Sequence, residues 1–290
     1  MKVVVFVLCA LFARADDLSD AYDALKRAEA LRDATNVHKY AVETSRLARI
    51  QIAAQVPPAI RDSYQKEREI YLTQTDTYTE YSMAVAASYP NTAPEVIAQL
   101  VDAIILQTPK SDYLALAVPP YLASLTDAAQ LAAAEKILKL QPENEDALLA
   151  LTDGNLRAKQ YPAAERYAAE LLAVMSGKTR PERYSVEAWR EKKAQMVTRV
   201  HFNAGVSACA QQAWQTCDVH FRAVTVEPAI EGQVSFYLGL ANYQLAKATP
   251  DRARMEQALK FSRQAAATPG PTQSAAQQNV AAIQQELAKK

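Results

Sequence analysis

Few residues in this sequence have side chains suited to metal binding or proton transfer. The histidines are His38, His201 and His220. A zinc site needs three or four converging ligands, often with two histidines four residues apart on a helix. No HExxH motif is present, and His201 and His220 are 19 residues apart on different expected helices. We therefore interpret the histidines as scattered, partly exposed side chains, after weighing Cys209, Cys217 and His220 as metal ligands.

Motifs for other common chemistries are absent from the sequence. It contains no serine nucleophile elbow, no P-loop and no dinucleotide-binding fingerprint. The acidic pair Glu145 and Asp146 falls in an expected first helical turn, where carboxylates interact favourably with the helix dipole. We expect a protein that is not an enzyme and uses no cofactor or metal. The alternative is an enzyme or ligand-binding protein whose site would lie around His201, His220 and Asp218.

Cys209 and Cys217 are a candidate disulfide pair. They lie near the end of one expected helix and the start of the next, with a turn around Ala213 and Trp214 between them. A hairpin turning there would bring the two Cα atoms within the roughly 4.4–6.8 Å that a disulfide bridges. Two free, buried thiols acting as small apolar side chains are the alternative. No CxxC motif is present, so a bond here would be structural.

The first fifteen residues have the pattern of a signal peptide. Lys2 precedes an apolar run over residues 3–12, and an A-x-A cleavage pattern ends at Ala15. The run is too short to span a bilayer comfortably. We expect cleavage after Ala15 and export to a periplasmic or secreted location, with a bacterial envelope as the setting. An uncleaved segment that tethers the protein to the membrane is the alternative.

The charge balance argues against a polyanionic partner. The sequence has 32 basic and 32 acidic residues. Cleavage would remove Lys2 and Arg14, which leaves 30 basic residues against 32 acidic ones. There is no basic run and no basic helix with interleaved aromatic residues, so we expect no nucleic-acid partner. After cleavage we also expect no membrane span.

Composition and chain breaks predict an all-α protein. Only six glycines are present, alanine is abundant, and strand-type alternation is nearly absent. We expect a first hairpin of helices at 18–32 and 37–55, closed by Pro57-Pro58. A long helix from 61 to 88 follows, and Thr92 is expected to cap the next one. We expect Pro119-Pro120 to kink or divide the helix that contains them.

Two chain corners show the same pattern 33 residues apart. "TPKSDY" places Pro109 and Ser111 as "QPENED" places Pro142 and Asn144. In the second corner we expect the preceding helix to end at Leu140 and Asn144 to cap the next. Helix pairs joined by such a corner near a fixed period are typical of a helical solenoid.

The second half of the sequence resembles the tetratricopeptide repeat family, whose unit is a 34-residue helix-turn-helix. "NLRAKQYPAAERYAAELL" is similar to the turn and second helix of that repeat, and Gly205 and Gly239 are one period apart. The residues that match the packing positions of the repeat are Ala164, Ala168, Leu171, Gly205, Phe221, Leu238, Gly239 and Ala258. No Trp occupies the usual early position, and about 20 extra residues follow Ser176.

The resemblance implies a right-handed α-solenoid of stacked antiparallel helix hairpins. We expect a signal peptide at 1–15, divergent hairpins at 16–110, tetratricopeptide-like repeats at 111–271 and a capping helix at 272–290. The resemblance also implies a scaffold or adaptor that binds a protein or peptide in a concave groove. Small residues are expected where helices approach closely.

Tyrosine is the most abundant aromatic residue, with 14 copies. Tyr64, Tyr71 and Tyr78 are spaced by seven residues on one expected helix, and Tyr81 follows three residues later. One interpretation is an aromatic strip that lines the partner groove, because Tyr combines a large contact area with a hydrogen-bonding tip. The other, which we favour, is a packing seam against the neighbouring hairpin with the hydroxyls at its edge.

Overall fold

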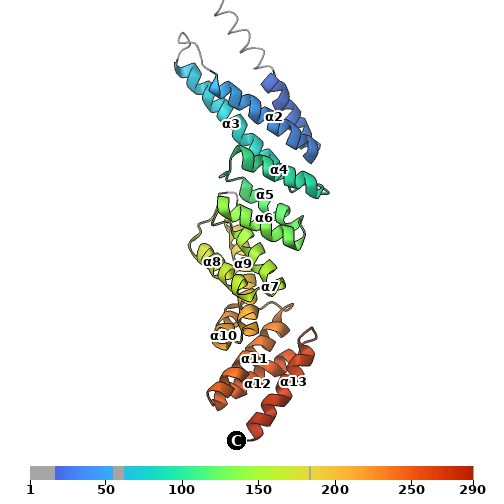
Figure 1. Cartoon of the computed structure of the whole chain (residues 1–290), viewed down its shortest axis with the longest axis vertical. Coiled ribbons are helices and arrows are strands. Elements are labelled where there is room, and N and C mark those ends of the chain that lie inside the picture. The colour runs from blue at the N-terminus through green and yellow to red at the C-terminus, as the bar shows by residue number, and fades with distance from the viewer. Residues whose placement is uncertain (1–16, 55–61, 183, 290) are drawn as a thin grey trace, which may run out of the picture. The chain divides into compact units, whose positions relative to one another are not determined.

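The computed structural model describes residues 17–54, 62–182 and 184–289, and these residues form helices without any strand (Figure 1). The expected signal peptide and Pro57-Pro58 lie outside the described residues. The chain divides into two compact units, residues 1–146 and 147–290. This division falls inside the segment 111–271 in which the sequence suggests repeats. No described helix is long and apolar enough to cross a membrane.

The first unit is a succession of helices that pack on their neighbours in chain order. Each helix from α2 to α5 contacts the next one, and α3 also contacts α5 two places further on. The helices are residues 17–30, α2 (Ala34–Ala53), α3 (Asp62–Ala86), α4 (Pro94–Gln107), α5 (Leu114–Ala123) and α6 (Asp127–Leu140). One part of the core joins three of them through the buried side chains of Leu18, Ala21, Leu47, Ala48 and Leu72.

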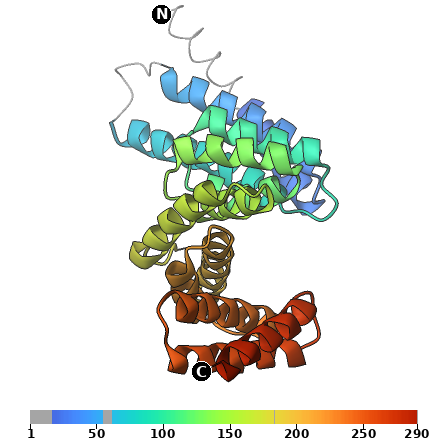
Figure 2. The same ribbon diagram turned by 60° about the horizontal axis from the view of Figure 1, so that its bottom comes forward.

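The second unit has the same construction, as Figure 2 shows from another side. From α8 onward each helix contacts the next one. Its helices are α7 (Glu145–Arg157), which begins at the boundary, α8 (Tyr161–Gly177), α9 (Val186–Ala210), α10 (Trp214–Ala223), α11 (Glu231–Ala248), α12 (Arg252–Ala267) and α13 (Gln273–Ala288). The all-α architecture of successively packed helices is therefore as the sequence predicts, and it has the arrangement of a helical solenoid.

Contacts between alternate helices distinguish the two sides of the second unit. α11 contacts both α9 and α13, whereas no comparable contact joins α10 to α12 within residues 184–289. The helices α9, α11 and α13 therefore form one row of this unit, and α10 and α12 lie outside that row.

The two corners with the same sequence pattern touch one another. The side-chain amide of Gln141 donates to the backbone carbonyl of Ser111 over 2.8 Å. The predicted helix end at Leu140 is confirmed, and α7 begins directly after Asn144. Asn144 is buried and its amide donates to the side-chain oxygen of Gln141 over 3.0 Å. Successive corners are thus stacked, as a chain of similar hairpins requires.

Two local predictions differ from the structure. The prolines do not divide the helix that contains them, because Pro119 and Pro120 both lie inside the single helix α5. The buried side chains of Leu114, Ala117, Val118 and Leu122 hold this short helix in place, so tertiary packing outweighs the backbone hydrogen bonds that the prolines remove.

Thr92 does not cap α4, because that helix begins at Pro94 with Ala93 as its N-cap residue. The hydroxyl of Thr92 instead donates over 3.0 Å to the carbonyl of Tyr89, which lies in the connection that follows α3. A proline already occupies the first helical position, where it needs no amide partner, so this end of α4 has one fewer donor for a threonine to cap.

Candidate partner-binding surfaces and side-chain clusters

The four predicted tyrosines of α3 differ in exposure. Tyr64 is 56% exposed, Tyr71 is 52% exposed and Tyr81 is 40% exposed. Tyr78 is half-buried. Residues seven apart on an α-helix lie on nearly the same face, so Tyr64, Tyr71 and Tyr78 follow one edge of α3. The first two present aromatic surface to solvent, and the third turns into the packed part of the unit.

Tyr78 belongs to a chain of ring contacts that crosses three helices. The centroid of Tyr22, in the helix at residues 17–30, lies 5.7 Å from that of Tyr78. Tyr78 and Tyr81 are 5.9 Å apart, and Tyr81 lies 5.6 Å from Tyr113 at the start of α5. Such separations are in the favourable range for aromatic pairs. We call the six residues Tyr22, Tyr64, Tyr71, Tyr78, Tyr81 and Tyr113 the tyrosine row.

Polar neighbours fix the orientation of Tyr78. Its hydroxyl donates to Glu29 Oε2 over 2.8 Å, and Lys26 Nζ lies 3.6 Å from the centroid of its ring. Burial raises the pKa of Tyr78 above its ordinary value, so the hydroxyl remains a proton donor. The packing interpretation thus describes Tyr78 well, whereas Tyr64 and Tyr71 have most of their surface free for contact.

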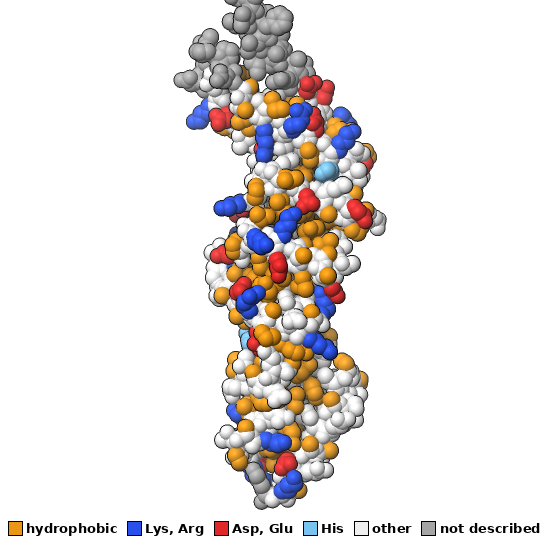
Figure 3. Space-filling view, viewed as in Figure 1, with side chains coloured by type: hydrophobic (Ala, Val, Ile, Leu, Met, Phe, Trp, Pro, Cys, Tyr) orange, Lys and Arg blue, Asp and Glu red, His pale blue; other side chains and the backbone are white. Residues whose placement is uncertain are grey.

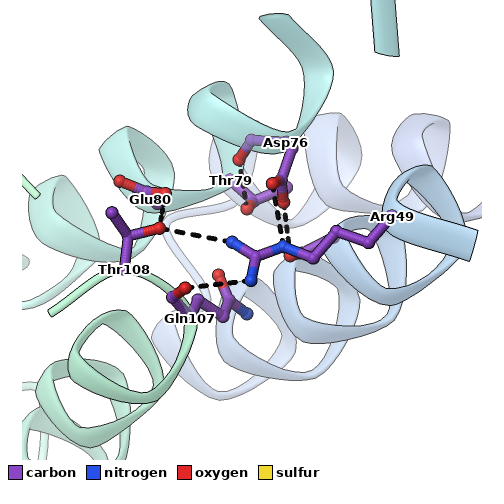
Figure 4. Close-up of polar contacts among 7 residues, drawn as sticks. Arg49, Asp76, Thr79, Glu80, Gln107 and Thr108 are labelled. Carbon is purple, nitrogen blue, oxygen red and sulfur yellow. Dashed lines mark hydrogen bonds and ion pairs between the residues drawn. The ribbon is translucent and has the colours of Figure 1, made fainter. Parts of the chain in front are cut away.

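A polar network surrounds Arg49 and connects residues of α2, α3 and α4 (Figure 4). Arg49 of α2 donates to Asp76 Oδ2 over 2.8 Å, to the carbonyl of Gln107 over 2.9 Å and to the hydroxyl of Thr108 over 3.2 Å. That hydroxyl donates in turn to Glu80 Oε1 over 2.6 Å. The network therefore joins α2 and α3 to the C-terminal end of α4.

The network explains how α3 can keep its tyrosines in a fixed register. Asp76 and Glu80 are four residues apart and share one face of α3, roughly opposite Tyr78. Glu80 is 6% exposed, and Arg49 supplies a cation to the last carbonyl groups of α4, where the helix dipole is negative. Each of these charged side chains therefore has a hydrogen-bond partner within the network.

In the second unit, a shallow pocket of about 380 Å³ opens beside α9. Phe202 and Ile230 supply its apolar surface, and the polar lining residues are Gln195, Thr198, Arg199, Asn203 and Glu227. Phe202 belongs to an aromatic group with Phe221 and Tyr237, at centroid distances of 5.5 and 6.4 Å. The pocket is a second place where an apolar side chain of a partner could be held.

Arg199 at this pocket is not free to bind an anion on its own. Its guanidinium lies 2.6 Å from Asp153 Oδ2 of α7, and Asn203 donates to the other oxygen of the same carboxylate. Burial raises the pKa of Asp153, against the opposing effect of the nearby arginine. The pair mainly fastens α7 to α9 and places the guanidinium at the rim of the pocket.

The expectation that the histidines are scattered is wrong for two of them. His201 of α9 and His220 of α10 are half-buried, and their Nδ1 atoms lie 3.0 Å apart. Burial lowers the pKa of His201, and burial together with the nearby His201 lowers that of His220. Both imidazoles are therefore biased towards the neutral form near neutral pH.

Asp218 does not complete a catalytic cluster with this pair. Its two carboxylate oxygens accept hydrogen bonds from Asn242 over 2.7 Å and from Arg222 over 2.8 Å. Residues two apart on a helix face different directions, so Asp218 and His220 do not share a side of α10. The described residues also contain no group of three or more histidine, cysteine or acidic side chains that could hold a metal ion.

The α9–α10 hairpin contains the other residues that the sequence singles out. Cys209 and Cys217 form a disulfide with their Cα atoms 5.2 Å apart. Gln212 between them has a positive φ of 61°, which makes the tight turn after α9. One helical turn away, a Cβ added to Gly205 would lie 2.7 Å from the ring of Phe221. Glycine is thus needed here for close approach.

The remaining residues at repeat positions are also packed. Ala164, Ala168, Leu171 and Ala258 are at most 1% exposed, and Leu238 is 7% exposed. Gly239 meets Ser262 of α12, which confines the space at the α11–α12 contact. These side chains form the contacts between helices and are not accessible to a partner.

No family model matches the chain, and no curated protein matches it. The resemblance to tetratricopeptide repeats therefore rests on the residues themselves.

Some members of these sites were not identified from the sequence. Tyr22 and Tyr113 join the tyrosine row from helices 56 and 35 residues away from Tyr78, and nothing in their local sequence marks them. The pocket at Phe202 likewise depends on the α10–α11 connection, which the helix pattern alone does not place. The 33-residue spacing of corners could have suggested which alternate helices share a face.

Proposed function

We propose that this chain is a non-catalytic helical-repeat scaffold that binds a protein or peptide on the tyrosine row. The observation that carries this proposal is the exposure of Tyr64 and Tyr71, at 56% and 52%, on the same edge of α3 as the packed Tyr78. Large aromatic side chains on a rigid element lose little entropy on binding and commonly dominate the energy of interfaces. The polar network behind α3 supports the required rigidity.

The charge distribution favours a partner recognised by shape and aromatic contact. The face seen in Figure 3 carries basic and acidic side chains interspersed with apolar ones, without a large area of one sign. The overall formal charge is zero. A partner steered by strong opposite charge would require a more uneven surface.

The test is site-specific photocrosslinking in the source cell envelope. A photoreactive residue at position 71 should give a discrete crosslinked product, and Tyr64→Ala should weaken it. In the matched control, the photoreactive residue replaces Leu106, which is 83% exposed on α4 and lies outside the tyrosine row. Equal capture of the same protein at both positions, or a product unaffected by Tyr64→Ala, contradicts the proposal.

The proposal includes export to a periplasmic or secreted compartment. The pattern of residues 1–15 and the Cys209–Cys217 disulfide support it, since disulfides persist in oxidising compartments. N-terminal sequencing of the protein recovered from its source should begin at Asp16. A sequence that begins at residue 1 on membrane-bound protein would instead favour a tethered form.

A ligand-binding protein or enzyme is the second candidate, and the pocket at Phe202 is the observation that favours it. This candidate predicts that a small molecule accompanies the purified protein. Mass spectrometry under native conditions would detect such a molecule, and Phe202→Ala should release it. Crosslinking at position 71 would be unaffected by that change, which separates the two candidates.

A further inference from the structure

The pair formed by His201 and His220 has no role in the proposed partner surface. The two side chains come from the adjacent antiparallel helices α9 and α10. Their Nδ1 atoms are 3.0 Å apart and their ring centroids are 5.3 Å apart. Each ring is half-buried, so solvent still reaches the pair. Two nitrogen atoms of the same kind therefore converge on one point between the helices.

We propose that His201 and His220 form a two-histidine binding site for Cu²⁺ or Ni²⁺. Metal–nitrogen bonds to histidine are about 2.0–2.1 Å long, which separates two ligand nitrogens by about 2.9 Å at a right angle and about 3.3–3.4 Å in a tetrahedron. The separation of 3.0 Å between the two Nδ1 atoms lies between these values.

The protons balance without an added reagent. In the neutral pair, one Nδ1–H donates to the other Nδ1, so one ring carries its proton on Nδ1 and the other on Nε2. When an ion binds, the donor ring gives up its Nδ1 proton to water and takes one from water at Nε2. Both Nδ1 lone pairs are then ligands, and the neutral pair releases no net proton.

The ligand type selects the class of ion. Imidazole nitrogen suits copper, nickel and zinc, whereas magnesium and calcium prefer carboxylate and carbonyl oxygen. The described residues offer no third histidine, cysteine or acidic ligand at this position. Water or a small anion must fill the remaining coordination positions of the ion. We expect the site to bind Cu²⁺ more tightly than Ni²⁺ or Zn²⁺.

A bound ion would add a second link to a hairpin that already has one. The Cys209–Cys217 disulfide joins α9 to α10 beside the turn, and the histidines join the same two helices further from it. Metal binding should therefore stabilise the folded protein and leave the disulfide intact, since an ion that binds only the folded state raises its stability.

The experiment is a titration of the untagged protein with Cu²⁺ and with Ni²⁺, followed by calorimetry and by the thermal unfolding midpoint. We expect one ion to bind per chain and the midpoint to rise. His201→Gln and His220→Gln should each weaken binding by roughly 10–100-fold or more. The matched control is His38→Gln, which removes the third, half-buried histidine and should leave binding unchanged.

Three results would overturn the site. They are no binding of either ion, binding that survives the removal of His201 or His220, and an equal loss of binding in His38→Gln. Unfolding of each metal-free variant, followed by circular dichroism, shows that the substituted proteins fold. The electron paramagnetic resonance spectrum of bound Cu²⁺ gives a second readout, because two imidazole nitrogens split the signal and one nitrogen gives a different pattern.

Discussion

Gly239 of α11 lies directly against Ser262 of α12. A Cβ built on Gly239 would be 2.5 Å from the hydroxyl oxygen of Ser262 and 3.0 Å from its backbone nitrogen. A side-chain rotation of the serine can relieve only the first of these contacts. The backbone of α12 would have to move to relieve the second, so the glycine sets how closely the two helices approach.

We expect Gly239→Ala to lower the free energy of unfolding by about 1–3 kcal/mol, because the added methyl group overpacks the α11–α12 contact. Urea denaturation measures this change. Gly177→Ala is the control, since an added Cβ there meets nothing within 4 Å. The Gly239→Ala/Ser262→Gly double variant should recover part of the loss. An unaltered unfolding curve for Gly239→Ala would contradict this prediction, because it would mean that α11 and α12 can move apart without a loss of folding free energy.

The Cys209–Cys217 disulfide closes a loop with a sequence separation of eight residues. Restricting such a loop in the unfolded chain contributes about 2–2.5 kcal/mol in the chain-entropy model. The Cys209→Ala/Cys217→Ala variant should therefore unfold at a lower denaturant concentration by a corresponding amount. The same variant should not respond to dithiothreitol, whereas the parent protein should. Mass spectrometry with thiol alkylation checks that the parent protein is oxidised.

The histidine pair predicts a loss of stability in acid. Burial lowers the folded-state pKa values of His201 and His220 below the ordinary value of 6.5, so the folded protein binds protons less readily than the unfolded chain. The stabilisation that comes from burying the neutral histidines is fully present above pH 6.5. It is lost as the pH falls through 6.5 towards the lowered pKa values of the folded state. The free energy of unfolding measured over this range should fall less steeply in the His201→Gln/His220→Gln variant. A parallel pH profile for the two proteins would contradict the burial of the pair.

Arg49 provides a test of the network behind the tyrosine row. Arg49→Lys keeps the charge but cannot reach Asp76, Gln107 and Thr108 together, so we expect a loss of about 1–2 kcal/mol after allowance for the partial exposure of this side chain. Arg46→Lys is the matched control, because Arg46 is exposed and donates hydrogen bonds to Glu43 within the same helix α2. Hydrogen exchange at the end of α4 should accelerate in Arg49→Lys alone.

Local sequence signals predicted the helices and many of their ends. The break at Leu140 was predicted from Pro142 and Asn144, and α6 ends at that residue. These signals act within a few residues, because they depend on a missing amide or a capping side chain. The proline pair at 119–120 was misjudged because the burial of α5 depends on its neighbours in space.

Side-chain clusters were harder to predict than helices. His201 and His220 meet because the α9–α10 hairpin has a particular register, and their separation of 19 residues carries no helical periodicity. Tyr78 was correctly placed on one edge of α3, but its partners Tyr22 and Glu29 come from a helix that contacts it only in the folded unit. Such contacts depend on how whole helices pack against one another. A local sequence pattern does not show this packing.

The cross-link in the α9–α10 hairpin also has a mechanical consequence. When the chain is pulled from its two ends, the segment between Cys209 and Cys217 cannot extend while the bond is intact. Eight residues fully stretched span about 26–29 Å, so this length stays hidden from the applied force until a reductant cuts the bond. After reduction, the extension measured for a single molecule should therefore increase by slightly less than this length of about 26–29 Å, since the intact bond already spans a few ångströms.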